Sequence, residues 1–333
     1  MTDFVSLGRK MIGWVNCFVE IKRLTRVFYL VEQTMHRITL RQIHIFETVA
    51  RYQSHTKAAA IIHMTQPAVS MQMKQLEDSL GIKLIERHGK SITLTREAQA
   101  LRQYTSNIMQ SYRALENYVD DLKGCEQGNL IISATTTANH FTSRILSKFS
   151  RLHPNVNLSL DVTNRKTILT QLEHNEPDHV IMGEPPEGMD LTSEIFMNNP
   201  LVIIAHPDHP LKNQKNISIS EAFKEKFVIR EAGSGTRIAI ERHLKKYKVN
   251  CESGLEMTSN ESLKHAVAAG FGLGIVSQHT IELELKSDYL CILDVESFPI
   301  LRHWHLVTRK GKPVSLIASA FREFLLEECK QLS

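Results

Sequence analysis

Apolar residues recur at spacings of three and four along LRQIHIFETVARY, residues 40–52, which predicts a helix with one buried face. The next stretch, SHTKAAAIIHM, is rich in small and apolar residues and predicts a short helix that packs closely on its neighbour. Thr56 is a candidate N-cap for this second helix, since its hydroxyl can accept from a first-turn amide. The apolar face of the first helix consists of Ile43, Phe46, Val49 and Ala50.

A third helix is predicted in TQPAVSMQMKQLEDSLG. Thr65 is suited to be its N-cap, and Pro67 falls in the first turn, where a missing N–H costs nothing. Gly81 is expected to end the helix. The buried stripe follows spacings of four, three and four: Val69, Met73, Leu76 and Leu80. Two such helices joined by the short HMT turn make a helix-turn-helix.

The other face of the third helix points outward, mostly at its N-terminal end, and carries Gln66, Pro67, Ser70, Met71 and Lys74. In a helix-turn-helix this end enters the major groove of DNA. Gln can bond adenine in two places, Ser can donate or accept, and Met or Pro can contact a thymine methyl. Lys74 is placed for a phosphate. The alternative is an ordinary solvated face on a small helical domain; we favour DNA reading.

The segment KLIERHGKSITLT predicts two short strands around a tight turn at His88-Gly89. Arg87, His88 and Lys90 crowd the tip of this hairpin. A basic hairpin that follows a helix-turn-helix is a wing, placed to touch the sugar-phosphate backbone or the minor groove.

No Pro or Gly interrupts residues 96–123, which predicts a helix of about 42 Å at 1.5 Å per residue. Its residues at alternating spacings of four and three form an apolar seam, broken only by Thr105: Leu101, Thr105, Ile108, Tyr112, Leu115, Val119 and Leu122. The seam either packs on the chain's own C-terminal domain or pairs with a second copy, and we favour a dimer, because two-fold proteins bind two-fold operators. Gly124 and Gly128 indicate a linker.

From Gly128 onward, short apolar stretches alternate with stretches of helical periodicity, which predicts α/β layers with mainly parallel sheets. There are too many such units for one sheet, and MNNP (197–200) and SFP (297–299) provide natural crossing points. We therefore predict two lobes within 125–333: lobe 1 from about 128–197 and 300–333, and lobe 2 from about 198–299. A cleft between two lobes is a natural small-ligand site.

Two segments are candidates for holding that ligand. REAGSGTRIAI places Ser234, Gly235, Thr236 and Arg237 at a strand-to-helix junction, where free backbone N–H groups and the helix dipole favour an anion. Arg237 can add a bidentate contact to a phosphate or carboxylate. The second candidate is ATTTANH, which sets three hydroxyls just past a strand: Thr135, Thr136 and Thr137. The alternative for the first segment is a plain helix N-terminus, and the alternative for the second is that the threonines only cap the helix.

The charged residues are unevenly distributed along the chain, and this bears on the kind of partner that it binds. The net charge is +4, but residues 35–95 hold eight Lys and Arg against four Asp and Glu, giving +4, whereas residues 96–333 hold 27 against 29, giving −2. A basic N-terminal module on a near-neutral body indicates a polyanionic partner. Five cysteines without paired spacing fit free thiols in a reducing compartment, so we expect a cytoplasmic protein.

Several classes of protein are disfavoured. No apolar run reaches the length of a membrane span, and we expect no membrane association. The histidines of HPDHP and HWH lack a third ligand nearby, so no metal is expected. No persuasive nucleophile–base arrangement is present, and an enzyme is the weaker alternative class, with no catalytic residues assigned.

Residues 1–34, outside these patterns, lack a signal-peptide cleavage site. They either form an amphipathic helix or are translated upstream sequence with Met35 as the working start, and we favour the second interpretation. The domain plan is then an N-terminal extension (1–34), a winged helix-turn-helix (35–95), a linker helix (96–124) and a ligand-binding domain (125–333).

The stretch TQPAVSMQMKQLE, within residues 35–95, resembles the winged helix-turn-helix of LysR-type transcriptional regulators. TQPAVSMQ, IMGEPPEGMD and REAGSGTR are similar to the subgroup that regulates RuBisCO operons, the CbbR-like proteins. The resemblance implies a two-lobed effector domain like that of periplasmic binding proteins behind the linker helix. Many relatives carry Arg where Met71 stands, so base readout there should be more apolar.

The resemblance also implies partners and site residues. It implies a dimer of dimers on double-stranded promoter DNA, a small phosphorylated or carboxylated inducer, no cofactor, and an indirect effect on RNA polymerase. DNA contacts are then expected at Gln66, Pro67, Ser70 and Met71, with wing contacts near Arg87 and Lys90, and effector contacts at Thr135–Thr137 and Ser234–Arg237. The alternatives are a LysR-type regulator of an unrelated operon or a small-molecule-binding protein without DNA function.

Overall fold

The structure is a computed structural model that describes residues 38–88, 91–122 and 128–330. The chain divides into two compact units, Met1–Thr105 and Ser106–Ser333. The predicted N-terminal extension, the wing residue Lys90 and the linker at Gly124 lie outside the described residues. No helix among the described residues is both long enough and apolar enough to cross a membrane.

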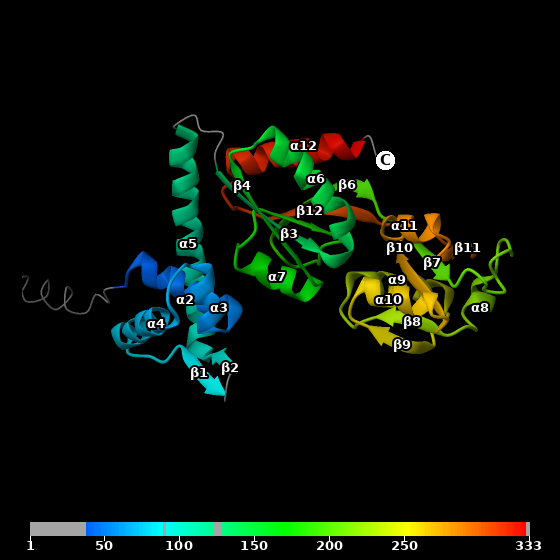
Figure 1. Cartoon of the computed structure of the whole chain (residues 1–333), viewed down its shortest axis with the longest axis horizontal. Helices are drawn as coiled ribbons and strands as arrows, with labels where there is room; N and C mark the ends of the chain where they lie inside the picture. The colour runs from blue at the N-terminus through cyan, green and yellow to red at the C-terminus, as the bar shows by residue number, and fades with distance from the viewer. Residues whose placement is uncertain (1–37, 89–90, 123–127, 331–333) are drawn as a thin grey trace, which may run out of the picture. The chain divides into compact units, whose positions relative to one another are not determined.

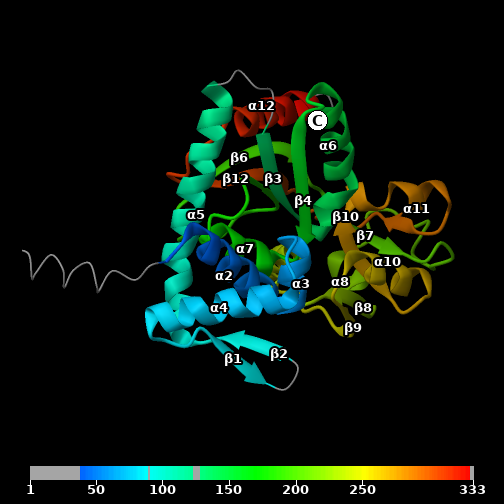
Figure 2. The same cartoon turned by 60° about the vertical axis from the view of Figure 1, so that its left-hand side comes forward.

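The first unit combines a three-helix core with a hairpin. Its elements are α2 (Leu40–Tyr52), α3 (His55–Ile61), α4 (Gln66–Leu80), β1 (Ile85–His88), β2 (Ser91–Leu94) and the first part of α5 (Arg96–Leu122). The hairpin lies next to α4 in both views of the molecule (Figures 1 and 2). Phe46, Val69 and Leu84 are completely buried in one core that joins the helices to the base of the hairpin. The predicted helix-turn-helix and wing are therefore confirmed.

The helix ends follow from local chemistry, with one correction. Thr65 caps α4, Pro67 lies in its first turn, and Gly81 ends it with φ +69°, a left-handed conformation that glycine adopts readily. The prediction that Thr56 caps the second helix was wrong. Ser54 is the N-cap, since its Oγ accepts from Lys57 N at 3.2 Å, and the helix begins before Thr56.

The long helix α5 is confirmed, and its apolar seam is interrupted for a structural reason. Thr105 is buried, and its hydroxyl bonds the carboxylate of Glu47 on α2, which joins α5 to the helical core. Beyond Thr105 the seam residues are exposed: Ile108, Tyr112, Leu115 and Val119.

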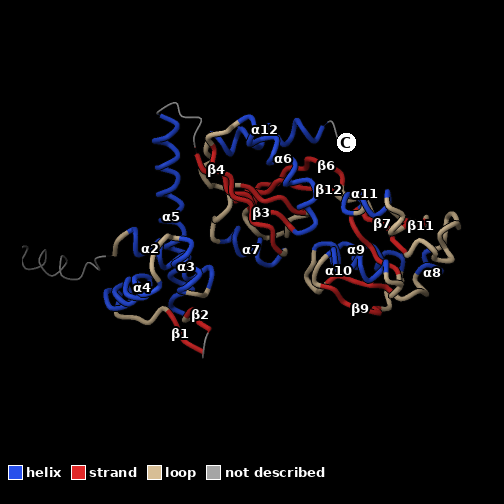
Figure 3. The backbone as a smooth tube through the Cα atoms, viewed as in Figure 1, coloured by secondary structure: helices blue, strands red, loops and turns tan. Residues whose placement is uncertain are grey.

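The second unit is built on two five-stranded sheets, drawn red in Figure 3. The first sheet has the order β4-β3-β5-β12-β6 and contains β3 (Gly128–Thr135), β4 (Val156–Thr163), β5 (His179–Met182), β6 (Leu191–Asn198) and β12 (His303–Arg309). Three helices accompany it: α6 (Asn139–Leu152), α7 (Arg165–Glu173) and α12 (Leu316–Lys330).

The second sheet has the order β11-β7-β10-β8-β9 and contains β7 (Leu201–Ala205), β8 (Phe227–Arg230), β9 (Ser253–Met257), β10 (Leu273–Ser277) and β11 (Cys291–Leu293). Its helices are α8 (Ile219–Ala222), α9 (Gly235–Tyr247), α10 (Asn260–Ala268) and α11 (Glu282–Lys286). Each sheet also has one short 3-10 turn: η1 (Thr136–Ala138) follows β3 of the first sheet, and η2 (Gln278–Thr280) follows β10 of the second. We call the two halves lobe 1 and lobe 2.

The prediction of mainly parallel sheets was wrong, because each sheet is mixed. β3 is parallel to β4 and β5, and β8 is parallel to β9 and β10. β12 is antiparallel to β5 and β6, and β7 is antiparallel to β10 and β11. Strands that enter a sheet from the other lobe do not pass through a crossover helix, so nothing forces them to be parallel. The pattern also missed β6, which continues directly into β7 across Asn199 and Pro200.

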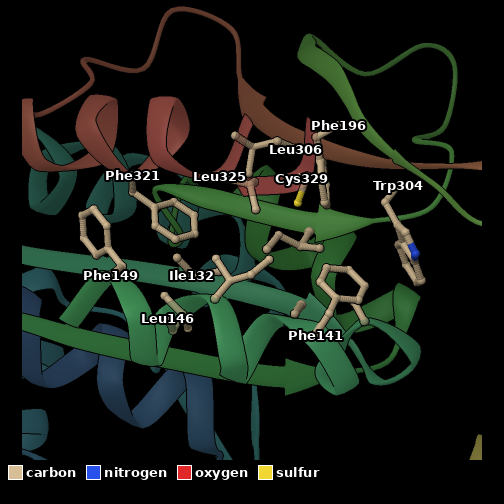
Figure 4. Packing of buried hydrophobic residues seen from close by; sticks show 14 of the residues in the cluster. Ile132, Phe141, Leu146, Phe149, Phe196, Trp304, Leu306, Phe321, Leu325 and Cys329 are labelled. Atoms are coloured by element: carbon tan, nitrogen blue, oxygen red, sulfur yellow. The ribbon is translucent and has the colours of Figure 1, made fainter. Parts of the chain in front are cut away.

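Aromatic packing fills the core of lobe 1 (Figure 4). Phe149 meets Phe321 edge-on with ring centroids 5.2 Å apart, and Phe141 meets Trp304 in the same way at 5.3 Å. Such edge-to-face pairs are favoured by the ring quadrupoles. The Trp304 ring is thereby fixed at the end of the core where β12 enters the sheet.

Candidate functional site

The outward face of α4 is available for contact. Gln66, Pro67, Met71 and Lys74 are exposed, Met71 by 55%, and Ser70 is half-buried. All five side chains lie within the first three turns of the helix, while Val69, Met73 and Leu76 are buried on its other side. The structure therefore brings onto one surface the four residues predicted to contact bases and Lys74, which was predicted to contact a phosphate.

Two of these residues are linked to a histidine that the sequence analysis did not single out. Gln66 Nε2 donates to Ser70 Oγ at 2.8 Å, and Ser70 Oγ lies 2.9 Å from His55 Nδ1 on α3. The link holds the Gln66 carboxamide in one orientation. No sequence signal pointed to His55, because the two residues are fifteen positions apart and meet only when α3 crosses α4.

The wing is joined firmly to α4. Glu77 Oε1 accepts from Leu84 N at 2.8 Å, and Glu77 Oε2 accepts from Lys83 Nζ at the same distance. Burial raises the pKa of Glu77, but these hydrogen bonds, with one from Ile85 N, outweigh burial and hold the pKa below its usual value. Arg87 lies in β1, paired with Ile92, and Lys90 lies outside the described residues.

A cleft lies between the two lobes of the second unit, where the carboxyl ends of β3, β4, β5, β8 and β10 come together. This is the position at which α/β folds bind ligands. Six of the seven residues predicted for the effector line it: Thr135, Thr136, Thr137, Ser234, Gly235 and Thr236. Thr135 Oγ1 and Thr137 Oγ1 are 3.5 Å apart, and the Ser234 side chain makes no cap bond to α9.

Arg237, the seventh residue, does not line the cleft. Its guanidinium donates to Glu241 Oε1 at 2.8 Å, to Glu256 Oε2 at 2.7 Å and to the carbonyl of Arg230. Two carboxylates already neutralise it, and these hydrogen bonds raise its pKa above the usual value. The sequence placed Arg237 correctly at the start of a helix but could not show on which side of the helix its side chain lies.

Three other arginines line the cleft: Arg230 at the end of β8, Arg165 at the start of α7 and Arg302 just before β12. Arg230 is paired with Glu231 at 2.7 Å, so Arg165 and Arg302 supply the net positive charge. Arg302 forms no ion pair with any carboxylate in the described part of the chain. The nearby Glu184 is bonded by Arg242 at 2.6 Å, and Arg165 donates to the Glu184 carbonyl at 2.7 Å. Burial lowers the pKa of Arg302 to about 10, and repulsion from Arg165 and Arg242 adds to this effect, against an opposing pull from Glu184.

Gly183 makes room for this arrangement. A Cβ at Gly183 would lie 2.4 Å from Arg302 Nη2, and a Cβ at Gly235 would lie 3.6 Å from Arg165 Nη1. The two guanidinium groups therefore rest against bare backbone, at the end of β5 and the start of α9. The cleft has a free volume of about 30 Å³, which is room for about two waters.

These two sites define the class of the protein. A helix-turn-helix whose second helix has an exposed polar face, next to a wing, is typical of a DNA-binding module, and a two-lobed domain with a cationic cleft is typical of a ligand-binding module. Together they make a ligand-responsive transcriptional regulator.

Comparisons with known proteins identify the family. Residues 40–99 match "Bacterial regulatory helix-turn-helix protein, lysR family", and residues 123–330 match "LysR substrate binding domain". The chain belongs to the LysR family, and it is a DNA-binding transcriptional regulator with a small-molecule effector domain. Its family, fold and general function are therefore as the sequence predicted.

Three relatives show what the chain is similar to. The "RuBisCO operon transcriptional regulator" of Allochromatium vinosum is 47% identical over 298 residues, which cover 90% of this chain and 98% of that protein. The regulatory domain of Synechocystis CcmR, solved in complex with 2-PG, is 40% identical with a TM-score of 0.60, covering 62% of this chain and 99% of that one. CbnR, a LysR family transcriptional regulator, shares the fold with a TM-score of 0.62 at 17% identity. The match covers 88% of this chain and 99% of CbnR.

Proposed function

We propose that this protein regulates carbon-fixation genes, including those for RuBisCO, and that a small anionic metabolite in the cleft sets its activity. The gene assignment is supported by the likeness to the Allochromatium vinosum regulator along nearly the whole length of both chains. The ligand class is supported by the likeness to the CcmR domain that holds 2-PG.

The single observation that carries the ligand proposal is the unpaired charge of Arg302. A half-buried cation without a carboxylate partner is costly, and an anion offsets that cost. Arg165 and the first-turn amides of α9, at Gly235 and Thr236, border the same space, so one phosphate or carboxylate group reaches both guanidinium groups and a helix N-terminus.

We propose that Gln66, Pro67, Ser70 and Met71 read base edges in the major groove, and that Lys74 binds phosphate. The exposure of these side chains and the orientation of the Gln66 carboxamide support this assignment. Arg87 and Lys90 on the wing are proposed to bind the backbone beside the helix.

The seam of α5 supports an oligomer. Its exposed Ile108, Tyr112, Leu115 and Val119 recur at coiled-coil spacing on one helix, which is the pattern that a second copy covers. We propose a dimer through this seam and a dimer of dimers on promoter DNA, acting in the cytoplasm.

Ligand entry is proposed to act through the lobes. The cleft has room for about two waters, so a metabolite must separate the lobes to enter. A changed lobe angle would alter how the oligomer spaces its DNA-binding modules, and thereby how RNA polymerase engages the promoter.

A gel-shift assay in a salt series tests the proposal. The probes are the region upstream of the protein's own gene, the RuBisCO promoter of the same genome and a scrambled duplex of equal length. We expect tight binding to one or both natural sites and a steep decrease in affinity with salt. Binding to the upstream region but not to the RuBisCO promoter would remove the carbon-fixation assignment, and equal affinity for the scrambled duplex would overturn sequence-specific regulation.

A further inference from the structure

Three buried polar atoms in the cleft are not explained by an anion at Arg302. They are Asn199 Oδ1, Ser277 Oγ and Trp304 Nε1, on residues that are 2%, 2% and 1% exposed. None of the three has a hydrogen-bond partner within the described part of the chain. All three residues line the same cleft as Arg165 and Arg302.

Strand register places these residues together where the chain crosses between the lobes. Trp304 is paired with Met197, two residues before Asn199. Ser277 is paired with Leu201, two residues after Asn199. The backbone N–H of Asn199 donates to the carbonyl of Arg302 at 2.7 Å, which joins this group to the cationic end of the cleft. We call Asn199, Ser277 and Trp304 the crossing-strand group.

The Trp304 side chain is held by packing, not by its polar atom. Phe141 meets its ring edge-on, and Figure 4 shows the indole nitrogen turned away from the other labelled side chains of the core. A buried polar atom without a hydrogen-bond partner costs free energy, and few occur in native proteins. Three in one cleft indicate that a bound molecule supplies the missing partners.

The donors and acceptors define the chemistry of that molecule. Trp304 Nε1 can only donate, Asn199 Oδ1 can only accept, and the Ser277 hydroxyl can do either. A ligand oxygen that accepts from Trp304 and donates to Asn199 is a hydroxyl. A carboxylate would accept from Trp304 but would face the Asn199 oxygen without a proton to donate.

We propose that the effector carries two different polar groups: a phosphate or carboxylate bound by Arg165 and Arg302, and an alcohol hydroxyl bound by the crossing-strand group. The effector is therefore a hydroxylated organic anion such as a polyol phosphate. This inference rests on the proposed effector function of the cleft and adds a second determinant to it.

Isothermal titration of the full chain with three probes tests the inference. Inorganic phosphate offers the anion alone, 2-PG is the ligand of the CcmR domain, and glycerol 3-phosphate offers a phosphate with hydroxyls. We expect glycerol 3-phosphate to bind about 3- to 10-fold more tightly than inorganic phosphate, the contribution of one to two neutral hydrogen bonds. Trp304→Phe and Ser277→Ala should each reduce that difference, while Arg302→Gln should weaken all three probes.

A spectroscopic readout reports the contact directly. The chain has two tryptophans, Trp14 and Trp304, so its ¹⁵N-indole spectrum contains two signals, and Trp304→Phe identifies which belongs to the cleft. Glycerol 3-phosphate should move the Trp304 N–H signal downfield, and inorganic phosphate should not. Ser277→Ala, which removes one oxygen, provides the second test if Trp304→Phe fails to fold.

The outcomes separate this inference from the proposed function. If all probes bind with equal affinity to the wild type and to Ser277→Ala, and the Trp304 signal stays in place, the hydroxyl determinant is wrong and the anion site stands. If 2-PG binds more tightly than inorganic phosphate and glycerol 3-phosphate does not, the second group is not a hydroxyl and the inference is overturned. If none of the probes binds, the anion-responsive function itself fails.

Discussion

Ser70 Oγ on the proposed recognition helix lies 2.9 Å from Nδ1 of His55 on the preceding helix, while it accepts from Gln66 Nε2 at 2.8 Å. The three side chains form a hydrogen-bonded chain that runs from α3 to the surface proposed to contact DNA. A Gln that reads adenine must present its oxygen and one N–H in a fixed plane, and the second N–H is the one bonded to Ser70.

Replacing Gln66 with Ala should cost about 1–3 kcal/mol on the specific site, with little change on random DNA. His55→Ala should lower discrimination at the base pair proposed to be read by Gln66, because the carboxamide loses its support. Competition binding with single-base variants of the operator measures both effects. A uniform loss on every sequence, including random DNA, would show that His55 supports the fold and not base reading.

Gly183→Ala should weaken anion binding without unfolding the protein. The new Cβ would meet only the end of the Arg302 side chain, which can swing away. The guanidinium then leaves the cleft, and phosphate affinity should decrease about as much as in Arg302→Gln, by roughly 1.5–3 kcal/mol. Titration calorimetry with a parallel thermal melt checks this. Unchanged affinity in Gly183→Ala would mean that Arg302 does not hold the anion.

Arg237→Gln is the matched control for Arg302→Gln. Arg237 is bonded to Glu241 and Glu256 outside the cleft, so its loss should leave effector affinity unchanged. Its ion pairs are partly exposed, and their loss should cost no more than about 1 kcal/mol of stability. If Arg237→Gln abolishes the effector response and Arg302→Gln does not, the original sequence prediction is restored.

Leu115→Gln should disrupt the oligomer, because Leu115 is 58% exposed in the middle of the apolar seam. Arg113→Gln, about 200° away around the helix, is the control with the same new side chain. Sedimentation velocity should show smaller species for Leu115→Gln and wild-type behaviour for Arg113→Gln. The same species for both variants would place the dimer contact elsewhere.

The stability of lobe 1 should decrease as the pH falls below about 6.5. His179 is buried, and burial lowers its pKa from the usual 6.5, against an opposing hydrogen bond to the Ala318 carbonyl. The unfolded chain therefore takes up a proton that the folded chain resists, so acid favours unfolding, and the effect grows until the pH reaches the folded pKa. Urea titrations between pH 7.5 and 5 should show this slope, and His179→Gln should flatten it. An equal slope in both proteins would assign the effect to other groups.

The sequence predicted the helix-turn-helix in detail because its determinants are local. Thr65, Pro67 and Gly81 fix the ends of α4 within a few residues, and the spacing of Val69, Met73 and Leu76 fixes its buried face. Thr105, the one break in the seam, is explained only by Glu47, which lies 58 residues away. Strand β6 was not predicted from the sequence, because its exposed and buried positions do not alternate regularly.

By itself the sequence determined most helices and strands and the family, because capping, periodicity and strand-to-helix junctions are set by near neighbours. Of the seven residues that it predicted for the effector, six line the cleft. Only the tertiary structure decided that Arg165 and Arg302, rather than Arg237, are the cations facing the cleft. It also brought His55 to Ser70, and Trp304, Asn199 and Ser277 to one place. Whether a charge is free or neutralised depends on partners that meet through strand register and helix packing, and such contacts leave no local pattern in the chain.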